Sequence, residues 1–171
     1  MKAYIRRLET EFSLIENGFK EEERRALADY KSNDTEYIKE LVNADLFKVE
    51  RKIPYAKDYQ TCCDEAKEEQ INNERPELTK YLDNIEEYDT VYIGSPIYWG
   101  TMPQPMFTQL EKLNFNGKIV KPFTTHEGSG LGNVISDLQK ICVGANIKDA
   151  LAIKGTNAKD SKEIVEKWCR E

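Results

Sequence analysis

Short runs of β-forming residues alternate with polar stretches of helical spacing over most of the chain. The clearest run, Thr-Val-Tyr-Ile at 90–93, has no charge and suits a central strand covered on both faces. Further strand-like runs occupy 46–51, 118–125 and 150–154. Stretches with helix-forming composition separate them. This alternation predicts an α/β fold built on a parallel sheet.

Helices are expected over five segments, namely 53–73, 75–87, 105–113, the stretch after residue 132, and 161–170. The helix at 75–87 is predicted from apolar residues at helical spacing, which are Leu78, Tyr81, Leu82 and Ile85. In the last helix three residues are expected to face inward, Ile164, Val165 and Trp168. After the loop that ends at residue 132, one helix face is expected to carry Val134, Leu138 and Ile141.

The strand at 90–93 leads into a loop with two adjacent aromatic residues. Gly94, Ser95 and Pro96 are expected to end the strand, and Tyr98 and Trp99 follow just beyond its carboxyl end. Ligands bind at this edge in open α/β sheets. A large aromatic side chain there can stack on a flat cofactor. It can equally cap the end of the hydrophobic core.

A glycine-rich loop follows the strand-like run at 118–125. It reads His-Glu-Gly-Ser-Gly-Leu-Gly over 126–132 and precedes a predicted helix. Closely spaced glycines let backbone N–H groups approach a ligand, and a helix N-terminus favours an electron-rich group. One such loop is a weak signal, but two ligand-type loops after successive strands make a stronger one.

These stretches resemble the flavodoxin-like family, especially short bacterial flavodoxins with a P-I-W-W-G-type motif and a later T-H-x-G-S-G-x-G-type motif. Here the motifs are Pro-Ile-Tyr-Trp-Gly at 96–100 and Thr-His-Glu-Gly-Ser-Gly-Leu-Gly at 125–132. Ala-Asp-Leu-Phe at 44–47 also matches, and lesser matches lie at 55–59, 75–76 and 115–118. The resemblance covers 44–168. It implies a doubly wound parallel sheet in three layers that holds FMN without a covalent bond and passes electrons.

The resemblance also implies the residues of the cofactor site. Tyr98 or Trp99 would stack on the isoalloxazine, and backbone groups of the two loops would bind its edge and the ribityl chain. Ser32 and Thr35 would bind the phosphate. The full set of expected cofactor-binding residues is Ser32, Thr35, Ser95, Pro96, Ile97, Tyr98, Trp99, Gly100, Thr125, His126, Glu127, Gly128, Ser129 and Gly130.

The front of the chain departs from the family pattern. Family members open with a hydrophobic strand followed by a phosphate loop of the type Y-F-S-x-x-G-N-T. The nearest stretch here, Arg-Ala-Leu-Ala-Asp-Tyr-Lys-Ser-Asn-Asp-Thr at 25–35, is polar and lacks the glycine. Asp34 would bring a negative charge toward the phosphate, and two such charges repel by about 1 kcal/mol in water and more inside a protein. We therefore expect an N-terminal strand that is atypical or missing.

Strand one lies between two neighbours in the flavodoxin order 2-1-3-4-5, so its loss would leave a gap or an unpaired edge. Three solutions are open. Residues 1–8 supply a poor strand, the partner in a homodimer supplies it, or helices over 11–31 cover the gap. We expect a single domain over 1–171, with a divergent segment at 1–43 and a recognisable part at 44–171.

Composition narrows the function class. The chain has 171 residues and a net charge of −6, which argues against general nucleic-acid binding. An acidic electron carrier can dock on a basic redox partner protein, or it can reduce a small-molecule acceptor. No run of about 18 apolar residues predicts a membrane span, and no secretion signal opens the chain, so a cytoplasmic location is expected.

The cysteines and the single histidine predict no metal site. Cys62 and Cys63 are adjacent and lack the spacing of zinc ligands, while Cys142 is expected to be packed and Cys169 lies near the end. A disulfide framework does not fit a reducing compartment. His126 cannot form a metal cluster alone, and it either donates to the flavin edge or shapes its loop.

Two alternatives to an electron-transfer flavodoxin remain. One is a flavodoxin fold that has lost FMN and acts through oligomerisation or partner binding. The other is an FMN-dependent NAD(P)H quinone or nitro reductase. The intact aromatic and glycine loops favour a site that still binds FMN, whereas the altered phosphate loop argues against such a site. Electron transfer itself needs no catalytic acid or base, because the flavin carries the redox chemistry.

Overall fold

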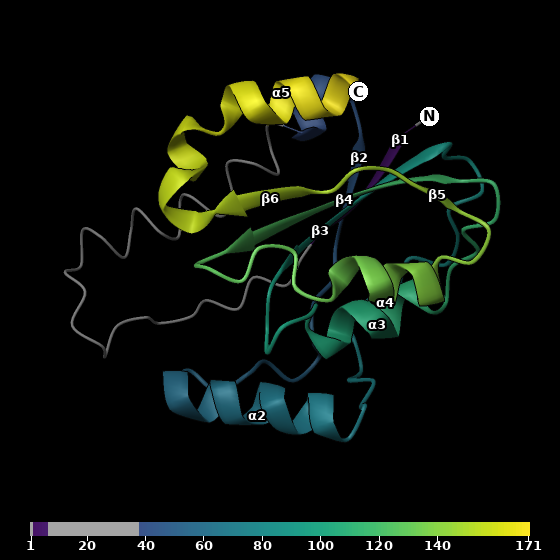
Figure 1. Ribbon diagram of the computed structural model, residues 1–171. Helices are drawn as coiled ribbons and strands as arrows, with labels where there is room; N and C mark the ends of the chain where they lie inside the picture. Colours follow the sequence, from purple (N-terminus) through teal and green to yellow (C-terminus); the bar gives the residue numbers. More distant parts are fainter. Residues whose placement is uncertain (1, 7–37) are drawn as a thin grey trace.

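The computed structural model describes residues 2–6 and 38–171, which form a parallel sheet with helices on both faces (Figure 1). The sheet order is β2-β1-β3-β4-β5, with β6 also paired to β4, and this confirms the predicted doubly wound topology. The strands are β1 (Lys2–Arg6), β2 (Asp45–Lys48), β3 (Thr90–Pro96), β4 (Ile119–His126), β5 (Asn146–Ile147) and β6 (Leu151–Lys154). β5 and β6 pair with successive parts of β4, so together they form one interrupted edge strand.

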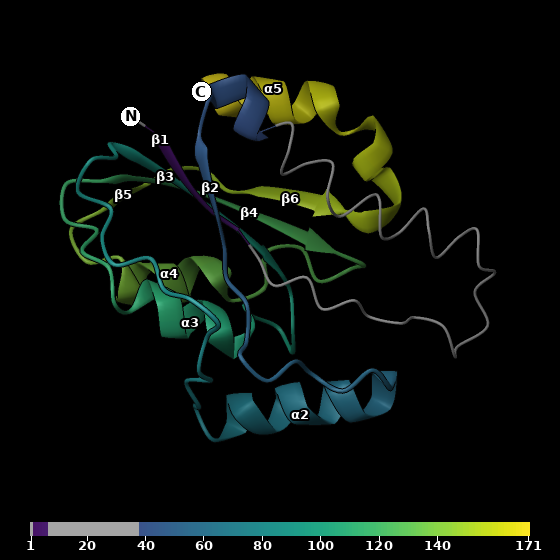
Figure 2. The ribbon, with the colours of Figure 1, turned by 180° about the vertical axis from the view of Figure 1, so that it is seen from behind.

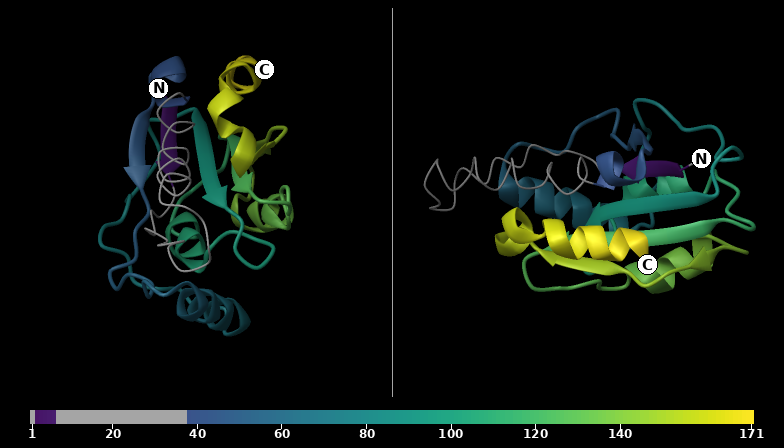
Figure 3. Two further views of the ribbon diagram at one scale, coloured as in Figure 1. Left: turned by 90° about the vertical axis from the view of Figure 1, so that its left-hand side faces the viewer. Right: turned by 90° about the horizontal axis from the view of Figure 1, so that it is seen from above.

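The helices form two layers. They are α2 (Tyr59–Ile71), α3 (Gln104–Leu110), α4 (Val134–Ile141), the 3-10 helix η2 (Gly155–Asp160) and α5 (Lys162–Arg170). α3 and α4 cover one face of the sheet, while α5 and the helical residues 38–42 cover the other (Figures 2 and 3). α2 contacts α3 and lies on the same side of the sheet as α3 and α4, farther from the sheet (Figure 2).

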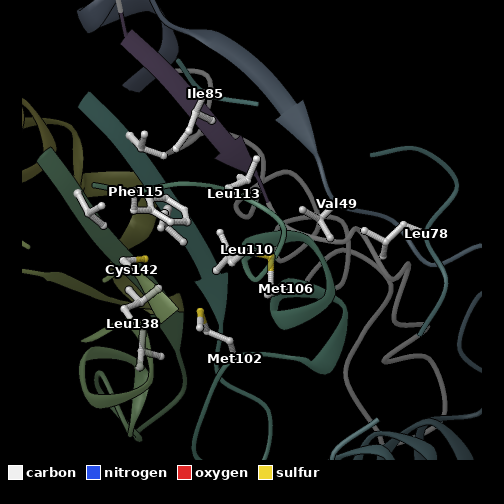
Figure 4. Close-up of a cluster of buried hydrophobic side chains, with 14 residues drawn as sticks. Val49, Leu78, Ile85, Met102, Met106, Leu110, Leu113, Phe115, Leu138 and Cys142 are labelled. Atoms are coloured by element: carbon white, nitrogen blue, oxygen red, sulfur yellow. The ribbon is translucent and has the colours of Figure 1, made fainter. Parts of the chain in front are cut away.

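The hydrophobic core is divided by the sheet. Val91 and Ile93 of β3 face α3 and α4, where they pack with Met106 and Leu110 (Figure 4). Tyr92 lies between them in the sequence and packs in the cluster on the opposite face. Successive side chains of a strand point to opposite faces, so a strand buried on both sides needs an uninterrupted apolar run. This confirms the prediction of a central strand at 90–93.

The first strand of the sheet is present and comes from the start of the chain. β1 pairs in parallel with both neighbours, with Tyr4 opposite Leu46 on β2 and opposite Tyr92 on β3. The first of the three alternatives is therefore correct, and the strand is atypical in sequence rather than missing. Because β1 fills the gap, the gap no longer argues for a dimer. The candidate phosphate loop at 25–35 and the candidate helix at 11–31 lie outside the described residues, and the division into 1–43 and 44–171 stays a prediction.

β3 is longer than the sequence predicts. Gly94 and Ser95 do not break the strand, since they pair with Phe123 and Thr124 of β4, and β3 ends only at Pro96. Proline has no N–H to donate to a ladder, and Pro96 stands at the last position of β3, where the pairing stops. The extension carries the chain to the carboxyl edge of the sheet before the aromatic loop begins.

The segment 75–87 is not a helix, so the prediction there is wrong. Leu78 forms an antiparallel bridge with Arg51, and the N–H of Thr79 donates to the carbonyl of Glu50 at 2.9 Å. These bonds to another segment replace the bonds to the preceding turn that a helix requires. The apolar residues of the segment still enter or border the core, notably Leu78, Leu82 and Ile85.

The helix α5 confirms two of its three predicted inward residues. Val165 is buried, and Trp168 packs edge to face on Tyr92 at a centroid distance of 5.7 Å. Ile164 is 59% exposed, which contradicts the prediction. The buried stripe runs through Ser161, Val165 and Trp168, with spacings of four and three residues, and Ile164 falls outside it.

Replacing Gln109 by leucine should lower the free energy of unfolding by about 2 kcal/mol. Gln109 of α3 is fully buried, its Nε2 donates to the carbonyl of Leu82 at 2.9 Å, and its Oε1 accepts the N–H of Leu82 at 3.0 Å. Leucine would leave both backbone groups without these partners. Urea unfolding measures the change, and the same substitution at exposed Gln60 should have little effect. An unchanged stability of Gln109→Leu would show that Leu82 finds other partners.

Candidate functional site

The loop after β3 makes a tight turn with Trp99 at its tip. The N–H of Tyr98 donates to the carbonyl of Thr101 at 2.7 Å, and the reverse bond measures 3.1 Å. Both central residues have positive φ, +48° for Trp99 and +85° for Gly100, as a two-residue turn of this kind requires. A left-handed backbone costs a residue with a side chain roughly 1–2 kcal/mol, so contacts from elsewhere must hold Trp99 there.

Those contacts come from one face of α2. The indole Nε1 of Trp99 donates to the carbonyl of Cys63 at 2.9 Å, and Nε2 of Gln70 donates to the carbonyl of Trp99 at 3.1 Å. Between them, the Lys67 ammonium lies 4.8 Å from the centre of the indole ring. The three α2 residues are four and three positions apart, so they share a helix face. Trp99 nevertheless remains 49% exposed, which leaves much of its ring surface open to a ligand.

Tyr98 has a different environment from its neighbour. Its ring meets that of Tyr55 edge to face at a centroid distance of 6.3 Å, within a small cluster that also holds Cys62 and Ala66. Tyr98 therefore caps a satellite core between the loop and α2. Of the two aromatic residues that the sequence could not separate, the exposed Trp99 is the better stacking candidate.

A buried polar group supports this satellite core. The hydroxyl of Tyr55 donates to Glu69 Oε2 at 2.5 Å, and Nη2 of Arg51 lies 3.1 Å from Glu69 Oε1. The Arg51 guanidinium also lies 4.1 Å from the centre of the Tyr55 ring. Burial raises the pKa of Tyr55, so its phenol stays protonated and can donate. Burial also raises the pKa of Glu69, against the opposing effects of the Tyr55 bond and the Arg51 charge.

The ion pair between Arg51 and Glu69 is close, but its angles are poor for hydrogen bonding. Within the described part of the chain, Nη1 of Arg51 and Oε1 of Glu69 are buried without a hydrogen-bond partner. A buried charge in this state depends strongly on its opposite charge. The support beneath Tyr98 is therefore sensitive to the loss of either residue.

The second loop follows β4 and is open on its outer side. The hydroxyl of Thr124 donates to the carbonyl of Gly130 at 3.0 Å, and the N–H of Gly128 donates to Nδ1 of His126 at the same distance. Gly128 and Gly130 have φ values of +152° and +59°, and a Cβ built on either would meet no atom within 4 Å. The glycines thus leave room for a ligand beside the backbone. His126 shapes the loop through Nδ1.

Two other predicted site residues have side chains directed elsewhere. Glu127 lies against the start of η2, where a Cβ on Gly155 would be 1.7 Å from its Oε1. Ser95 is buried, and its hydroxyl donates to the carbonyl of Pro96 at 2.8 Å. Any contact of Ser95 with a cofactor would therefore involve the backbone.

The two loops are joined backbone to backbone. The N–H of Asn133 donates to the carbonyl of Gly100 at 2.7 Å, and the hydroxyl of Thr101 donates to Asp137 Oδ2 at 2.6 Å. Gly132, with φ +48°, packs so closely that a Cβ would lie 2.3 Å from the Gly100 oxygen. Both loops leave the same edge of the sheet (Figure 1).

The structure thus brings most of the predicted site residues to one place, since the stretches 95–100 and 125–130 meet there. Ser32 and Thr35 lie outside the described residues. Sequence reasoning missed Cys63, Lys67 and Gln70, because their helix reads only as a polar connection. Their shared face on α2 was the one available signal.

The other candidate chemistry gives no second site. Among residues 2–6 and 38–171, no group of three or more His, Cys, Asp and Glu side chains is arranged to hold a metal ion. The four cysteines are free, and burial raises the pKa of the Cys62 and Cys142 thiols to about 12. Thiols with so high a pKa are not thiolate nucleophiles at neutral pH. Within the same residues, every helix is too short or too polar to cross a bilayer.

Solved structures share this fold. A protein of Bacteroides uniformis described as a flavoprotein is 24% identical, with a TM-score of 0.75 over 99% of this chain and 97% of that one. A Lactobacillus acidophilus flavoprotein in complex with FMN is 20% identical, with a TM-score of 0.60 over 95% and 97%. Fusobacterium nucleatum flavodoxin bound to flavin mononucleotide is 12% identical, with a TM-score of 0.54 over 99% and 94%. A search of curated proteins found no match.

A family model extends the comparison to the sequence itself. The model described as Flavodoxin matches residues 29–171, which include both loops, α2 and every strand except β1. The match begins within the polar stretch at 25–35. The chain belongs to the flavodoxin family.

Proposed function

We propose that this protein binds FMN non-covalently at the two joined loops and transfers electrons. The observation that carries the proposal is Trp99, which three contacts from α2 hold half-exposed. Its neighbour Gly100 packs against Gly132 of the glycine loop. The proteins from L. acidophilus and F. nucleatum, which share the fold, are described with bound FMN.

The residues present fit this cofactor. The exposed indole of Trp99 offers a flat apolar surface to an isoalloxazine ring. Gly128 and Gly130 leave open space in which backbone N–H groups, other than that of Gly128, which donates to His126, can approach polar edge atoms. These donors suit a ring system with carbonyl and nitrogen acceptors. Ser32 and Thr35 remain the proposed phosphate contacts.

The protein's own part in the reaction is binding, orientation and electrostatics. FMN supplies the redox chemistry when bound, and no side chain has to act as an acid or base. Trp99 would cover one flavin face and exclude water from it. The net charge of −6 would disfavour a second electron on the flavin and would favour docking on a basic partner. The proposed electron acceptor is a redox partner protein or a small molecule.

The direct test is the visible absorption spectrum of the purified protein, recorded before and after incubation with FMN and desalting. Retained flavin bands would support the proposal, and reduction of the loaded protein followed by reoxidation with a small acceptor would test electron transfer. A colourless protein would favour a fold that acts through oligomerisation or partner binding. Rapid NAD(P)H oxidation with a quinone or nitro compound would favour the reductase alternative.

Replacing Trp99 by alanine should weaken FMN binding roughly 10- to 100-fold, because aromatic stacking contributes about 1–3 kcal/mol. Quenching of FMN fluorescence on titration with protein measures the affinity. Trp99→Phe is the matched control, since it keeps a stacking ring and imposes the same backbone strain. Full affinity in Trp99→Ala would show that Trp99 does not stack on the flavin.

A further inference from the structure

We propose that Lys67 helps to set the reduction potential of the bound flavin, by holding a positive charge behind the indole of Trp99. In this arrangement the ammonium and the isoalloxazine lie on opposite faces of the same ring. The inference rests on the proposed function, because it assigns a role at the flavin to a residue outside both loops.

The indole that the Lys67 ammonium contacts is held in place by its neighbours. The ammonium lies 4.8 Å from the indole centre, within the range of a cation–π interaction. The indole cannot turn freely, because its Nε1 donates to the carbonyl of Cys63 at 2.9 Å. The backbone of Trp99 is also held, by the bond from Gln70 at 3.1 Å. A fixed ring with a cation on one face leaves its other face for a flat ligand.

The charge of Lys67 is available to act at a distance. Within the described part of the chain, no carboxylate lies within ion-pair distance of its ammonium, although Asp64, Glu65 and Glu68 are on the same helix. Glu65 instead lies 3.8 Å from Arg51 and accepts the N–H of Ala56 at 3.0 Å. Lys67 is exposed, so water screens its charge on the outer side, and the indole would shield only the side that faces the flavin.

The charge of Lys67 should affect the reduction of bound FMN. Full reduction of oxidised FMN takes up two electrons from the reductant and one proton from water, and it leaves one negative charge on the isoalloxazine. A cation behind the stacked indole stabilises that charge more than it stabilises the neutral oxidised ring. Lys67 should therefore increase the affinity for reduced FMN relative to oxidised FMN, and so make the midpoint potential less negative. It opposes the effect of the acidic protein as a whole.

The experiment compares wild type, Lys67→Met and Lys67→Arg, each loaded with FMN. Methionine keeps the length and the helix propensity but removes the charge, whereas arginine keeps the charge. Lys167→Met is the matched control, because it removes the same charge from an exposed site on α5, across the sheet. Fluorescence titration measures the affinity for oxidised FMN, and equilibration with reference dyes under anaerobic conditions measures the midpoint potential.

We expect Lys67→Met to lose roughly 3- to 10-fold more affinity for reduced than for oxidised FMN, with a more negative midpoint potential. Lys67→Arg and Lys167→Met should remain close to wild type. A midpoint potential unchanged in Lys67→Met, or equally changed in Lys167→Met, would overturn the proposal. So would tighter binding of oxidised FMN by Lys67→Met, since the lysine would then occupy the face that the flavin needs. A wild-type protein that takes up no FMN would instead overturn the proposed function, and this inference with it.

Discussion

Replacing Glu69 by leucine is expected to lower the free energy of unfolding by about 3 kcal/mol, because breaking a buried ion pair leaves an uncompensated charge. Glu69 is only 4% exposed, and its two oxygens serve Arg51 and Tyr55. Leucine would remove both interactions and leave the largely buried guanidinium without its nearest carboxylate. Glu65, 3.8 Å from Arg51, offsets part of the loss, so the expected cost lies at the low end for a broken buried pair.

Urea unfolding near pH 7 measures this effect, and Glu68→Leu is its control. Glu68 is the preceding residue on α2, carries the same charge and is exposed, so its replacement should change stability little. Because Tyr55 contacts Tyr98, Glu69→Leu should also weaken FMN binding. Equal stability of the Glu69 and Glu68 variants would mean that the buried pair contributes nothing to the fold.

Replacing Gly132 by alanine is expected to separate the two loops, with a loss of about 3 kcal/mol in stability and about tenfold or more in FMN affinity. A Cβ on Gly132 would lie 2.3 Å from the carbonyl oxygen of Gly100, and that oxygen belongs to the backbone and cannot rotate away. The same carbonyl accepts the N–H of Asn133, so a shift that relieves the clash also breaks the bond between the loops.

The control for Gly132→Ala separates the clash from the backbone strain. Gly117 also has a positive φ, +74°, but a Cβ there would meet no atom within 4 Å, and its turn lies outside both loops. Gly117→Ala should therefore cost only the left-handed backbone, roughly 1–2 kcal/mol, and leave FMN affinity unchanged. If the two variants were equally stable and bound FMN equally, close packing of the loops would have no role in the site.

Several elements of the fold could be predicted because their information is local. An uncharged run such as 90–93 can be buried on both sides, and this requirement holds whatever its neighbours are. Val165 and Trp168 were placed correctly for the same kind of reason, by their spacing on one helix. Local spacing gave a wrong prediction where the backbone forms hydrogen bonds with a distant segment. The segment 75–87 has helical periodicity, yet it pairs with residues around Arg51 and with the side chain of Gln109.

The first strand shows the same limit. Nothing in Lys-Ala-Tyr-Ile-Arg at 2–6 distinguishes a central strand from a polar terminus. Its place is decided by two neighbouring strands, β2 and β3, which both pair with it and would otherwise be left with unpaired backbone groups. The pairing depends on strands far away in the chain, so local sequence patterns do not indicate it.

The sequence by itself determined the family and the two stretches proposed as the site, because chain order and parallel strands bring 96–100 and 125–132 to one edge of the sheet. The place of the first strand came only from the tertiary structure. Only the tertiary structure decided how those stretches are used. It buries Tyr98 against Tyr55, leaves Trp99 open, and brings Lys67 over the indole. These outcomes depend on contacts between residues far apart in the chain, which side-chain packing selects and local spacing does not encode.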